Sequence, residues 1–380
     1  MADSLLRVDL LCSGLGRVQR GFETFARECF DAFRGDKDVD MRLFKGGGDN
    51  GSRERRLFSL ERSGLLAQSI ARMTRRSGYH VEQLTFFLSY LRWLRSAEPQ
   101  VIYLSDANLG NFLKRYRRRS GQKFRILYSN GGPIRPPFDE YDHVQQVAPT
   151  YFEEALVYGE PASKHSLVPY GIDPAGFDLP SAEQQRDARE RLGLPVSRTI
   201  LLSVGWISAQ HKRMDYVIRE VAQLPAEKRP FLMLLGHQDS ASGEIQALAE
   251  ERLSGGYQIR TCAQSDTYAY YRAADCFVLA SLKEGFGRVY MEAMLHGLPC
   301  IVHDYPVSRY VLGSHAIYSD MNVSGGLAET LEALTLGQKD FLPMERRDHI
   351  VRSFGWAALQ SAYLEMYRVT ASPFRPFSND

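Results

Sequence analysis

Two successive series of short apolar strands and helical segments run along this chain of 380 residues, and they constrain its fold more than any other feature. The first series predicts strands at 5–12, 39–44, 101–104 and 124–128, with helices at 18–33, 65–73 and 81–94. The second predicts strands at 199–204, 231–235, 276–279 and 300–302, with helices at 214–224, 243–253 and 288–296. Strands that alternate with helices indicate α/β domains, each built on a doubly wound parallel sheet.

The domain boundary is predicted where a segment rich in Pro and Gly, 166–174, interrupts the alternation. We expect an N-terminal domain at 1–172, a C-terminal domain at 173–355, and a final segment, 356–380, whose helix packs back on the first domain. Five scattered cysteines without a C-x-x-C pair predict reduced thiols. The absence of a secretory signal pattern and of a long apolar run predicts a cytoplasmic protein.

The segment 284–294 is the strongest indication of chemistry. The predicted strand 276–279 leads into a glycine-bearing turn that opens a helix. The first backbone N–H groups of such a helix suit a diphosphate, and Gly285 and Gly287 let the backbone approach it closely. Glu292 could then bind the paired hydroxyls of a ribose, and Glu284 those of a sugar. The plain alternative is that Glu284 caps the helix and Glu292 is solvated.

A longer run, 271–302, closely resembles the signature of family 4 retaining glycosyltransferases, the glycosyl transferases group 1. Val168-Pro169-Tyr170-Gly171-Ile172-Asp173 resembles the hinge of that family, and Ser203-Val204-Gly205-Trp206 with Lys212 resembles its V-G-R…K element. The resemblance implies a GT-B fold, in which two Rossmann-like domains face a central cleft, with the acceptor on the N-terminal side.

The same resemblance assigns roles to individual residues. Glu284, Lys212 and Asn130 are the expected catalytic residues; Asn130 stands near the place of the family's histidine, and Trp206 takes that of its arginine. Arg213 could supply the second positive charge, beside that of Lys212, that neutralises the donor diphosphate. The alternative is that Arg213 is a solvated residue in the first turn of a helix. The expected donor-binding residues are Gly16, Arg17, Arg213, Gly285, Phe286, Gly287, Arg288, Val289 and Glu292.

The function implied is the retaining transfer of a hexose-type sugar from a nucleotide-diphosphate sugar to an acceptor glycan, lipid or small molecule. A UDP-sugar is the preferred donor, ahead of a GDP-sugar. No cofactor and no metal ion are expected; Asp38-Val39-Asp40 precedes a strand, which disfavours a metal-binding D-x-D motif. A sugar-nucleotide epimerase and a non-catalytic nucleotide-sugar-binding subunit remain as alternatives. No nucleic-acid-binding module is recognisable.

A basic block lies in the first domain. Residues 42–125 contain 18 Lys and Arg against 6 Asp and Glu, a balance of 18 − 6 = +12 within a chain whose net charge is +2. The block is interleaved with Phe86, Phe87, Tyr90 and Trp93. A peripheral contact with an anionic membrane, on its inner face, is one interpretation, and a solvated face over core aromatics is the other.

Overall fold

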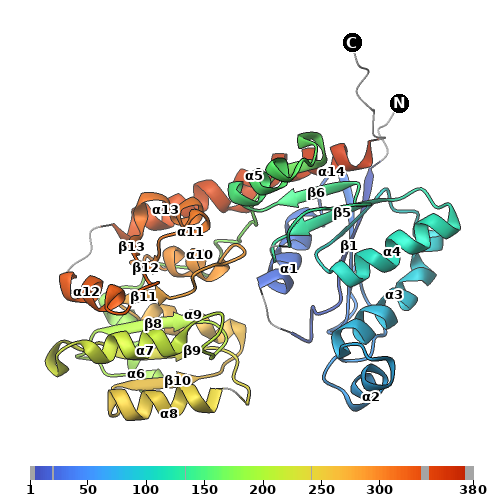
Figure 1. Ribbon diagram of the computed structural model, residues 1–380. Coiled ribbons are helices and arrows are strands. Elements are labelled where there is room, and N and C mark those ends of the chain that lie inside the picture. Colours follow the sequence, from blue (N-terminus) through green and yellow to red (C-terminus); the bar gives the residue numbers. More distant parts are fainter. Residues whose placement is uncertain (1–4, 19–20, 133, 241, 335–341, 373–380) are drawn as a thin grey trace. The chain divides into compact units, whose positions relative to one another are not determined.

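The computed structural model describes residues 5–372 except 19–20, 133, 241 and 335–341 (Figure 1). It divides into two compact units. Unit 1 comprises the described residues up to Asp173 and from Trp356 onward, and unit 2 comprises Pro174–Gly355. This division falls one residue from the boundary that the sequence suggests, and the C-terminal helix belongs to unit 1.

Unit 1 is a seven-stranded sheet, entirely parallel, in the order β3-β2-β1-β4-β5-β6-β7. Its strands are β1 (Leu6–Cys12), β2 (Val39–Lys45), β3 (Glu54–Arg56), β4 (Val101–Leu104), β5 (Arg125–Asn130), β6 (His143–Gln146) and β7 (His165–Leu167). Its helices are α1 (Gly21–Phe33), α2 (Leu65–Thr74), α3 (Gly78–Ala97), α4 (Ala107–Ser120), α5 (Pro149–Tyr158) and α14 (Trp356–Ala371).

The helix α14 closes the core of unit 1 with aromatic side chains. Its Tyr363 and Tyr367 are fully buried, and the Tyr363 hydroxyl donates to the Pro169 carbonyl at 2.8 Å. The ring of Trp356 stacks near Phe25 of α1, with 5.9 Å between centroids. These contacts explain why residues at the far end of the chain fold with the N-terminal sheet.

Unit 2 repeats the architecture with six parallel strands in the order β10-β9-β8-β11-β12-β13. The strands are β8 (Ile200–Val204), β9 (Phe231–Leu235), β10 (Tyr257–Arg260), β11 (Cys276–Leu279), β12 (Cys300–His303) and β13 (Ile317–Ser319). The helices are α6 (Ala182–Leu192), α7 (Met214–Gln223), α8 (Ser242–Leu253), α9 (Gln264–Ala273), α10 (Arg288–Leu295), α11 (Pro306–Leu312), α12 (Gly326–Ala333) and α13 (Pro343–Phe354). The central strands are apolar runs because helices cover both faces of the sheet.

The predicted fold class is confirmed. In α3, Leu84 and Leu88 recur at helical spacing, yet these side chains are 36% and 54% exposed. Phe86 and Tyr90 are buried instead. Their larger rings fill the space beneath the helix, so the helix is rotated from the orientation that the leucines predict.

Candidate functional site

The strand order of unit 2 reverses between β8 and β11, which are direct neighbours. In open parallel sheets, ligands bind outside the carboxyl ends of the strands at such a reversal, because the two connecting loops diverge there and leave a crevice. The loops concerned are 205–213 after β8 and 280–287 after β11. They contain six of the twelve residues expected at the site, namely Lys212, Arg213, Glu284, Gly285, Phe286 and Gly287.

Lys212 and Glu284 meet at this edge of the sheet. The Lys212 Nζ donates to Glu284 Oε1 at 2.6 Å, and the two side chains are only 15% and 7% exposed. The stem of Lys212 lies on Gly205, where an added Cβ would come within 2.8 Å of it. Two residues 72 positions apart thus form a largely buried ion pair.

The helix α10 begins directly beside this loop. Its first residue follows Gly287, whose φ of +79° suits glycine alone, since a Cβ there would come 2.4 Å from the Tyr290 ring. Tyr290 is fully buried, so its ring holds the turn in place. The first N–H groups of α10, those of Arg288 and Val289, are therefore presented at a fixed helix N-terminus that favours anions.

Glu292 lies one turn into α10 and is half-buried. The Tyr271 hydroxyl donates to its Oε2 at 3.0 Å. Burial raises the pKa of Glu292 above its ordinary value, and the charge of Arg288 and the Tyr271 hydrogen bond oppose that rise. The carboxylate is thus held in one orientation by a tyrosine that the sequence hypothesis did not include.

Two predicted donor-binding side chains have structural partners instead. Arg213 donates to the Met321 carbonyl at 2.6 Å and to the Ala280 carbonyl at 3.4 Å, and its guanidinium lies 4.3 Å from the centre of the Tyr216 ring. Phe286 is 3% exposed and packs edge-on against Phe354. In this structure the Arg213 side chain therefore connects two loops, and the Phe286 side chain packs inside unit 2.

Other residues at this site were not foreseen. His211 Nδ1 lies 3.8 Å from Glu284 Oε1, and the Tyr305 hydroxyl donates to the Glu284 carbonyl at 3.4 Å. Trp206 is 51% exposed and packs edge-on against His237, with 5.6 Å between ring centres. His211 stands beside Lys212 in the sequence. His237 and Tyr305 follow the predicted strands 231–235 and 300–302, whose carboxyl ends lie at the same edge of the sheet as Glu284, and this was the signal available for them.

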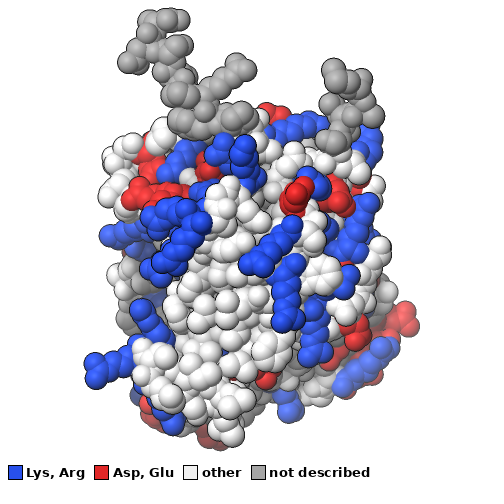
Figure 2. Space-filling model, turned by 90° about the vertical axis from the view of Figure 1, so that its right-hand side faces the viewer, with Lys and Arg blue, Asp and Glu red and all other residues white. Residues whose placement is uncertain are grey.

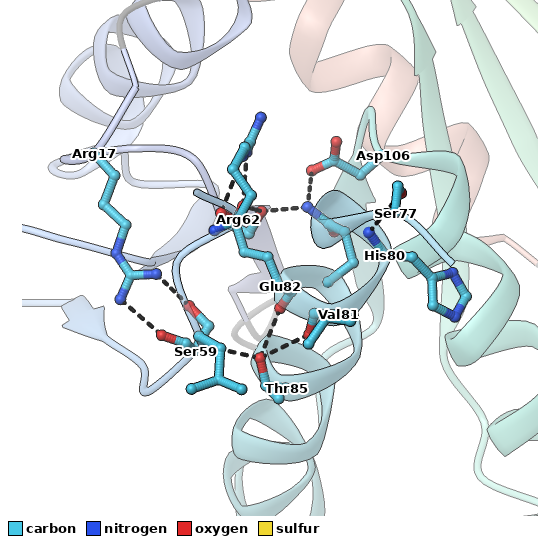
Figure 3. Close-up of polar contacts among 12 residues, drawn as sticks. Arg17, Ser59, Arg62, Ser77, His80, Val81, Glu82, Thr85 and Asp106 are labelled. Carbon is cyan, nitrogen blue, oxygen red and sulfur yellow. Dashed lines mark hydrogen bonds and ion pairs between the residues drawn. The ribbon is translucent and has the colours of Figure 1, made fainter. Parts of the chain in front are cut away.

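The glycine loop of unit 1 follows β1, as predicted, but its residues have local partners. Gly16 has a φ of +82°, and a Cβ there would come within 2.4 Å of Gly47. Arg17 donates from Nη1 to Ser59 Oγ at 2.9 Å and from Nη2 to the Ser59 carbonyl at 3.0 Å (Figure 3). Packing between loops of unit 1 thus gives a structural reason for a glycine at position 16 and an arginine at position 17.

A polar cluster lies where the strand order of unit 1 reverses, between β1 and β4. Glu82, fully buried on α3, accepts from Ser13 at 3.2 Å and from Arg62 Nη2 at 2.6 Å (Figure 3). Gln83 donates to Ser13 and, at 3.3 Å, to Asp106 Oδ2. Ser13 and Asp106 each follow a strand, which was the signal that could have identified this second polar edge.

Asn130 ends β5, as expected, but it is 1% exposed. Its Nδ2 donates to Gln146 Oε1 at 2.9 Å, and its Oδ1 accepts from the Ile134 backbone N–H at 3.0 Å. Asn130 thus fixes the loop after β5, and its catalytic role stays a prediction. His143 is a buried strand residue bonded to Ser166, and burial lowers its pKa to about 4.

The structure also describes the cysteines, the Asp38-Val39-Asp40 segment, and the arrangement of side chains and helices on which metal binding and membrane crossing depend. The cysteines are free thiols, four of them buried. Asp38 and Asp40 lie 3.2 and 3.4 Å from arginines, Arg368 and Arg53. Across the described ranges, no group of three or more His, Cys, Asp or Glu side chains is arranged to hold a metal ion. Within the same ranges, no helix is long and apolar enough to cross a membrane.

Comparisons with known proteins show which families and structures this chain resembles. Residues 184–340 match the family described as glycosyl transferases group 1. The alpha-monoglucosyldiacylglycerol synthase of Streptococcus pneumoniae is 27% identical over 44% of this chain and 40% of its own length. A D-inositol 3-phosphate glycosyltransferase of Xylanimonas cellulosilytica is 30% identical over 56% of this chain and 52% of its own. The chain thus spans about half the length of the curated relatives that it matches.

Solved structures match over nearly the whole chain. Sucrose-phosphate synthase from Thermosynechococcus elongatus superposes with a TM-score of 0.77 at 18% identity, over 95% of this chain and 98% of its own. Anabaena HepE, in complex with UDP and glucose, superposes with a TM-score of 0.72 at 14% identity, over 96% and 99%. The chain therefore has the GT-B fold of these structures, and its residues 184–340 resemble the glycosyl transferases group 1.

Proposed function

We propose that this protein is a retaining glycosyltransferase that moves a hexose-type sugar from a UDP-sugar to an acceptor hydroxyl. The observation that carries the proposal is the Lys212–Glu284 ion pair, formed at the strand reversal of unit 2 beside the N-terminus of α10. A cation, an anchored carboxylate and the backbone amides of a helix N-terminus suit a sugar diphosphate.

In the proposed complex the diphosphate lies against the backbone of Gly287 and Arg288, with Lys212 as its cation. Glu292 accepts hydrogen bonds from the ribose hydroxyls, and Glu284 from those of the transferred sugar. The bond between the anomeric carbon and the phosphate oxygen breaks while the acceptor oxygen bonds to the same face of that carbon. The acceptor proton passes to the leaving phosphate, and Lys212 stabilises the negative charge that grows there.

The acceptor is proposed to be a lipid-linked or cell-surface glycan precursor, modified in the cytoplasm at the inner face of a membrane. One relative is named a monoglucosyldiacylglycerol synthase, which supports a lipid-type acceptor. The choice of UDP rests on the same kind of support, the UDP and glucose in the Anabaena HepE complex. Neither a cofactor nor a metal ion is part of the proposal, because Lys212 and the helix amides supply the positive charge.

Glu284→Gln tests the role of the ion pair. Turnover of the UDP-sugar is expected to fall by at least about a hundredfold, because the amide neither orients Lys212 nor accepts hydroxyl bonds as strongly. Glu190→Gln is the matched control, since Glu190 pairs with Arg186 on the exposed face of α6, 3.8 Å away. The control should keep wild-type turnover; equal turnover in Glu284→Gln would refute the assignment.

The donor is identified by a thermal-shift screen across UDP-, GDP- and ADP-sugars, followed by product analysis. A donor at a hundredfold excess over its dissociation constant stabilises the folded state by about 2.7 kcal/mol. Release of UDP together with a glycosylated acceptor supports transfer. Formation of an epimer, or tight binding without turnover by every acceptor class, would instead identify an epimerase or a non-catalytic binding subunit.

A further inference from the structure

The helix α2 of unit 1 buries small side chains and exposes large apolar ones, which is the reverse of a helix that packs in a core. Its buried residues are Ala67 and Ala71, which pack with Val81 and Leu60. Leu65, Leu66 and Met73 are 88%, 69% and 83% exposed. The apolar spacing of α2 therefore marks an outward face, made of Leu65, Leu66, Ile70 and Met73.

This outward face continues onto neighbouring elements. Phe58, in the segment before α2, is 71% exposed, and its carbonyl accepts from Ser89 of α3 at 2.7 Å. Leu88, adjacent to Ser89, is 54% exposed. Scattered apolar side chains are normal on a soluble protein, but a helix that turns all of its large ones outward indicates a surface that is covered by something else.

The charges beside the face are positive. Between Arg62 and Val81 the sequence contains no acidic residue. Arg72, Arg75 and Arg76 are exposed, and none of them forms an ion pair with a residue that the structure describes. Figure 2 shows the side of the molecule on which α2, α3 and α4 lie: blue side chains flank a broad white surface, and red ones lie mostly toward its edges.

Several other parts of the basic block are neutralised or packed in the core. Arg117 bonds to Asp142, and Arg118 lies 3.1 Å from Glu140. Phe86 and Tyr90, the aromatics that suggested a membrane contact in the sequence, are in the core. Trp93 lies half-buried beneath the guanidinium of Arg55, at 4.0 Å. Exposed apolar side chains and arginines without an ion pair among the described residues thus occur together on α2; α3 carries a second set, with Leu84, Leu88, Arg92 and Arg95 exposed.

We propose that the outward face of α2 docks this protein onto an anionic lipid bilayer. The leucines and Met73 enter the boundary between headgroups and acyl chains, while Arg72, Arg75 and Arg76 meet the lipid phosphates. A bilayer suits this face better than a protein groove does, because the arginines need many anionic partners around a single protruding helix. The proposal rests on α2 alone and requires no particular donor or acceptor.

Vesicle flotation of the full-length chain, without nucleotide sugar, tests the proposal. Wild-type protein should float with vesicles of equal parts phosphatidylcholine and phosphatidylglycerol and not with phosphatidylcholine alone. Added salt should weaken that binding, because screening weakens the contacts with lipid phosphate. Binding to neither vesicle, or equal binding to both, would overturn the proposal.

Two double variants separate the apolar and basic parts. Leu65→Ser with Met73→Ser should reduce binding at least about tenfold, because apolar area no longer enters the bilayer. The control is Val157→Ser with Tyr158→Ser on α5, whose side chains are 90% and 60% exposed. Unfolding temperatures of both variants should match the wild type, since all four side chains are exposed, and unchanged flotation of Leu65→Ser with Met73→Ser would refute the role of α2.

For the charge, Arg72→Gln with Arg76→Gln should also lower binding to anionic vesicles. Arg186→Gln with Arg191→Gln removes the same charge from the exposed side of α6 in unit 2 and should leave binding unchanged. Equal loss in both pairs would show that net charge, not this face, drives binding. If the wild-type protein dimerises, and the variant with Leu65→Ser and Met73→Ser does not dimerise but still binds lipid, then α2 contacts a protein partner and the proposal is overturned.

Discussion

Replacing Gly287 by alanine should damage both the stability of unit 2 and its binding of a donor. The residue has a φ of +79°, and an added Cβ would lie 2.4 Å from Cδ2 and Cε2 of Tyr290. A left-handed conformation costs a residue with a Cβ about 1–2 kcal/mol. Forcing an extra methyl group into a packed site costs about 1–3 kcal/mol more, and the fully buried Tyr290 ring has no open space into which to move.

The expected destabilisation is therefore about 2–5 kcal/mol. For a unit of this size each kcal/mol lowers the unfolding temperature by about 2–4 °C, so a decrease of roughly 4–20 °C is expected by calorimetry. The stabilisation of unit 2 by UDP-sugar should shrink as well, because the amides of Arg288 and Val289 move with the turn.

Gly243→Ala is the matched control. Gly243 lies in the first turn of α8, where an added Cβ would meet nothing within 4 Å. Alanine there should be neutral, or stabilising by about 0.5–1 kcal/mol, because it restricts the unfolded chain. An unfolding temperature for Gly287→Ala equal to that of the control would refute the assigned turn geometry.

Two further substitutions probe side chains at the same edge of the sheet. Burial raises the pKa of Glu292 above its ordinary value of 4.5, so near and above pH 4.5 the folded state binds more protons than the unfolded state. The stability of the wild type therefore falls as the pH rises from 4.5 through the raised pKa of Glu292. Glu292→Gln should remove this loss and stabilise the ligand-free protein above pH 4.5. Unfolding temperatures across mildly acidic pH should lose that slope, and donor affinity should fall. Arg213→Met should lower the free energy of unfolding by about 1–2 kcal/mol, since two backbone carbonyls lose a donor. If Arg213 instead binds the diphosphate, calorimetric titration would show a large loss of UDP-sugar affinity in this variant.

Much of the fold could be predicted from sequence because its strands are short apolar runs bounded by turns. The predicted strands 101–104, 231–235 and 276–279 coincide with β4, β9 and β11. The edge strands β3, β7, β10 and β13 were missed, because their short, partly exposed sequences carry no such run. The helix α4 was missed for a similar reason, since its basic run masks the few apolar residues that face the core.

The orientation of an apolar stripe could not be predicted. In α2 and α3 the spacing of leucines indicates a helix, but it does not say whether the stripe faces the core or the outside. In α3 the aromatic rings Phe86 and Tyr90 fill the core, and Leu84 and Leu88 are left outside. The outcome depends on how well side chains fill the space beneath the helix, which is a property of the whole unit.

The site shows the same limit. The glycine turn and helix after β11 could be located, because a strand, a turn and a helix leave a local pattern. The partners of each polar side chain could not, because Tyr271, Tyr305 and Ser59 come from other parts of the chain. Arg17, Arg213 and Asn130 have the residue types that a donor site needs, yet each is held by hydrogen bonds within its own unit.

The charges around α10 explain how two acids can lie beside a helix end proposed to bind a diphosphate. Glu284 is paired with Lys212, and Glu292 accepts from Tyr271 near the charge of Arg288, so both negative charges are offset locally. Removing Lys212 would therefore weaken donor binding in two ways: the phosphate would lose a cation, and the charge of Glu284 would be uncovered. Removing the charge of Glu284 frees Lys212 instead. Lys212→Met should consequently lower donor affinity more than Glu284→Gln does, although both changes break the same ion pair.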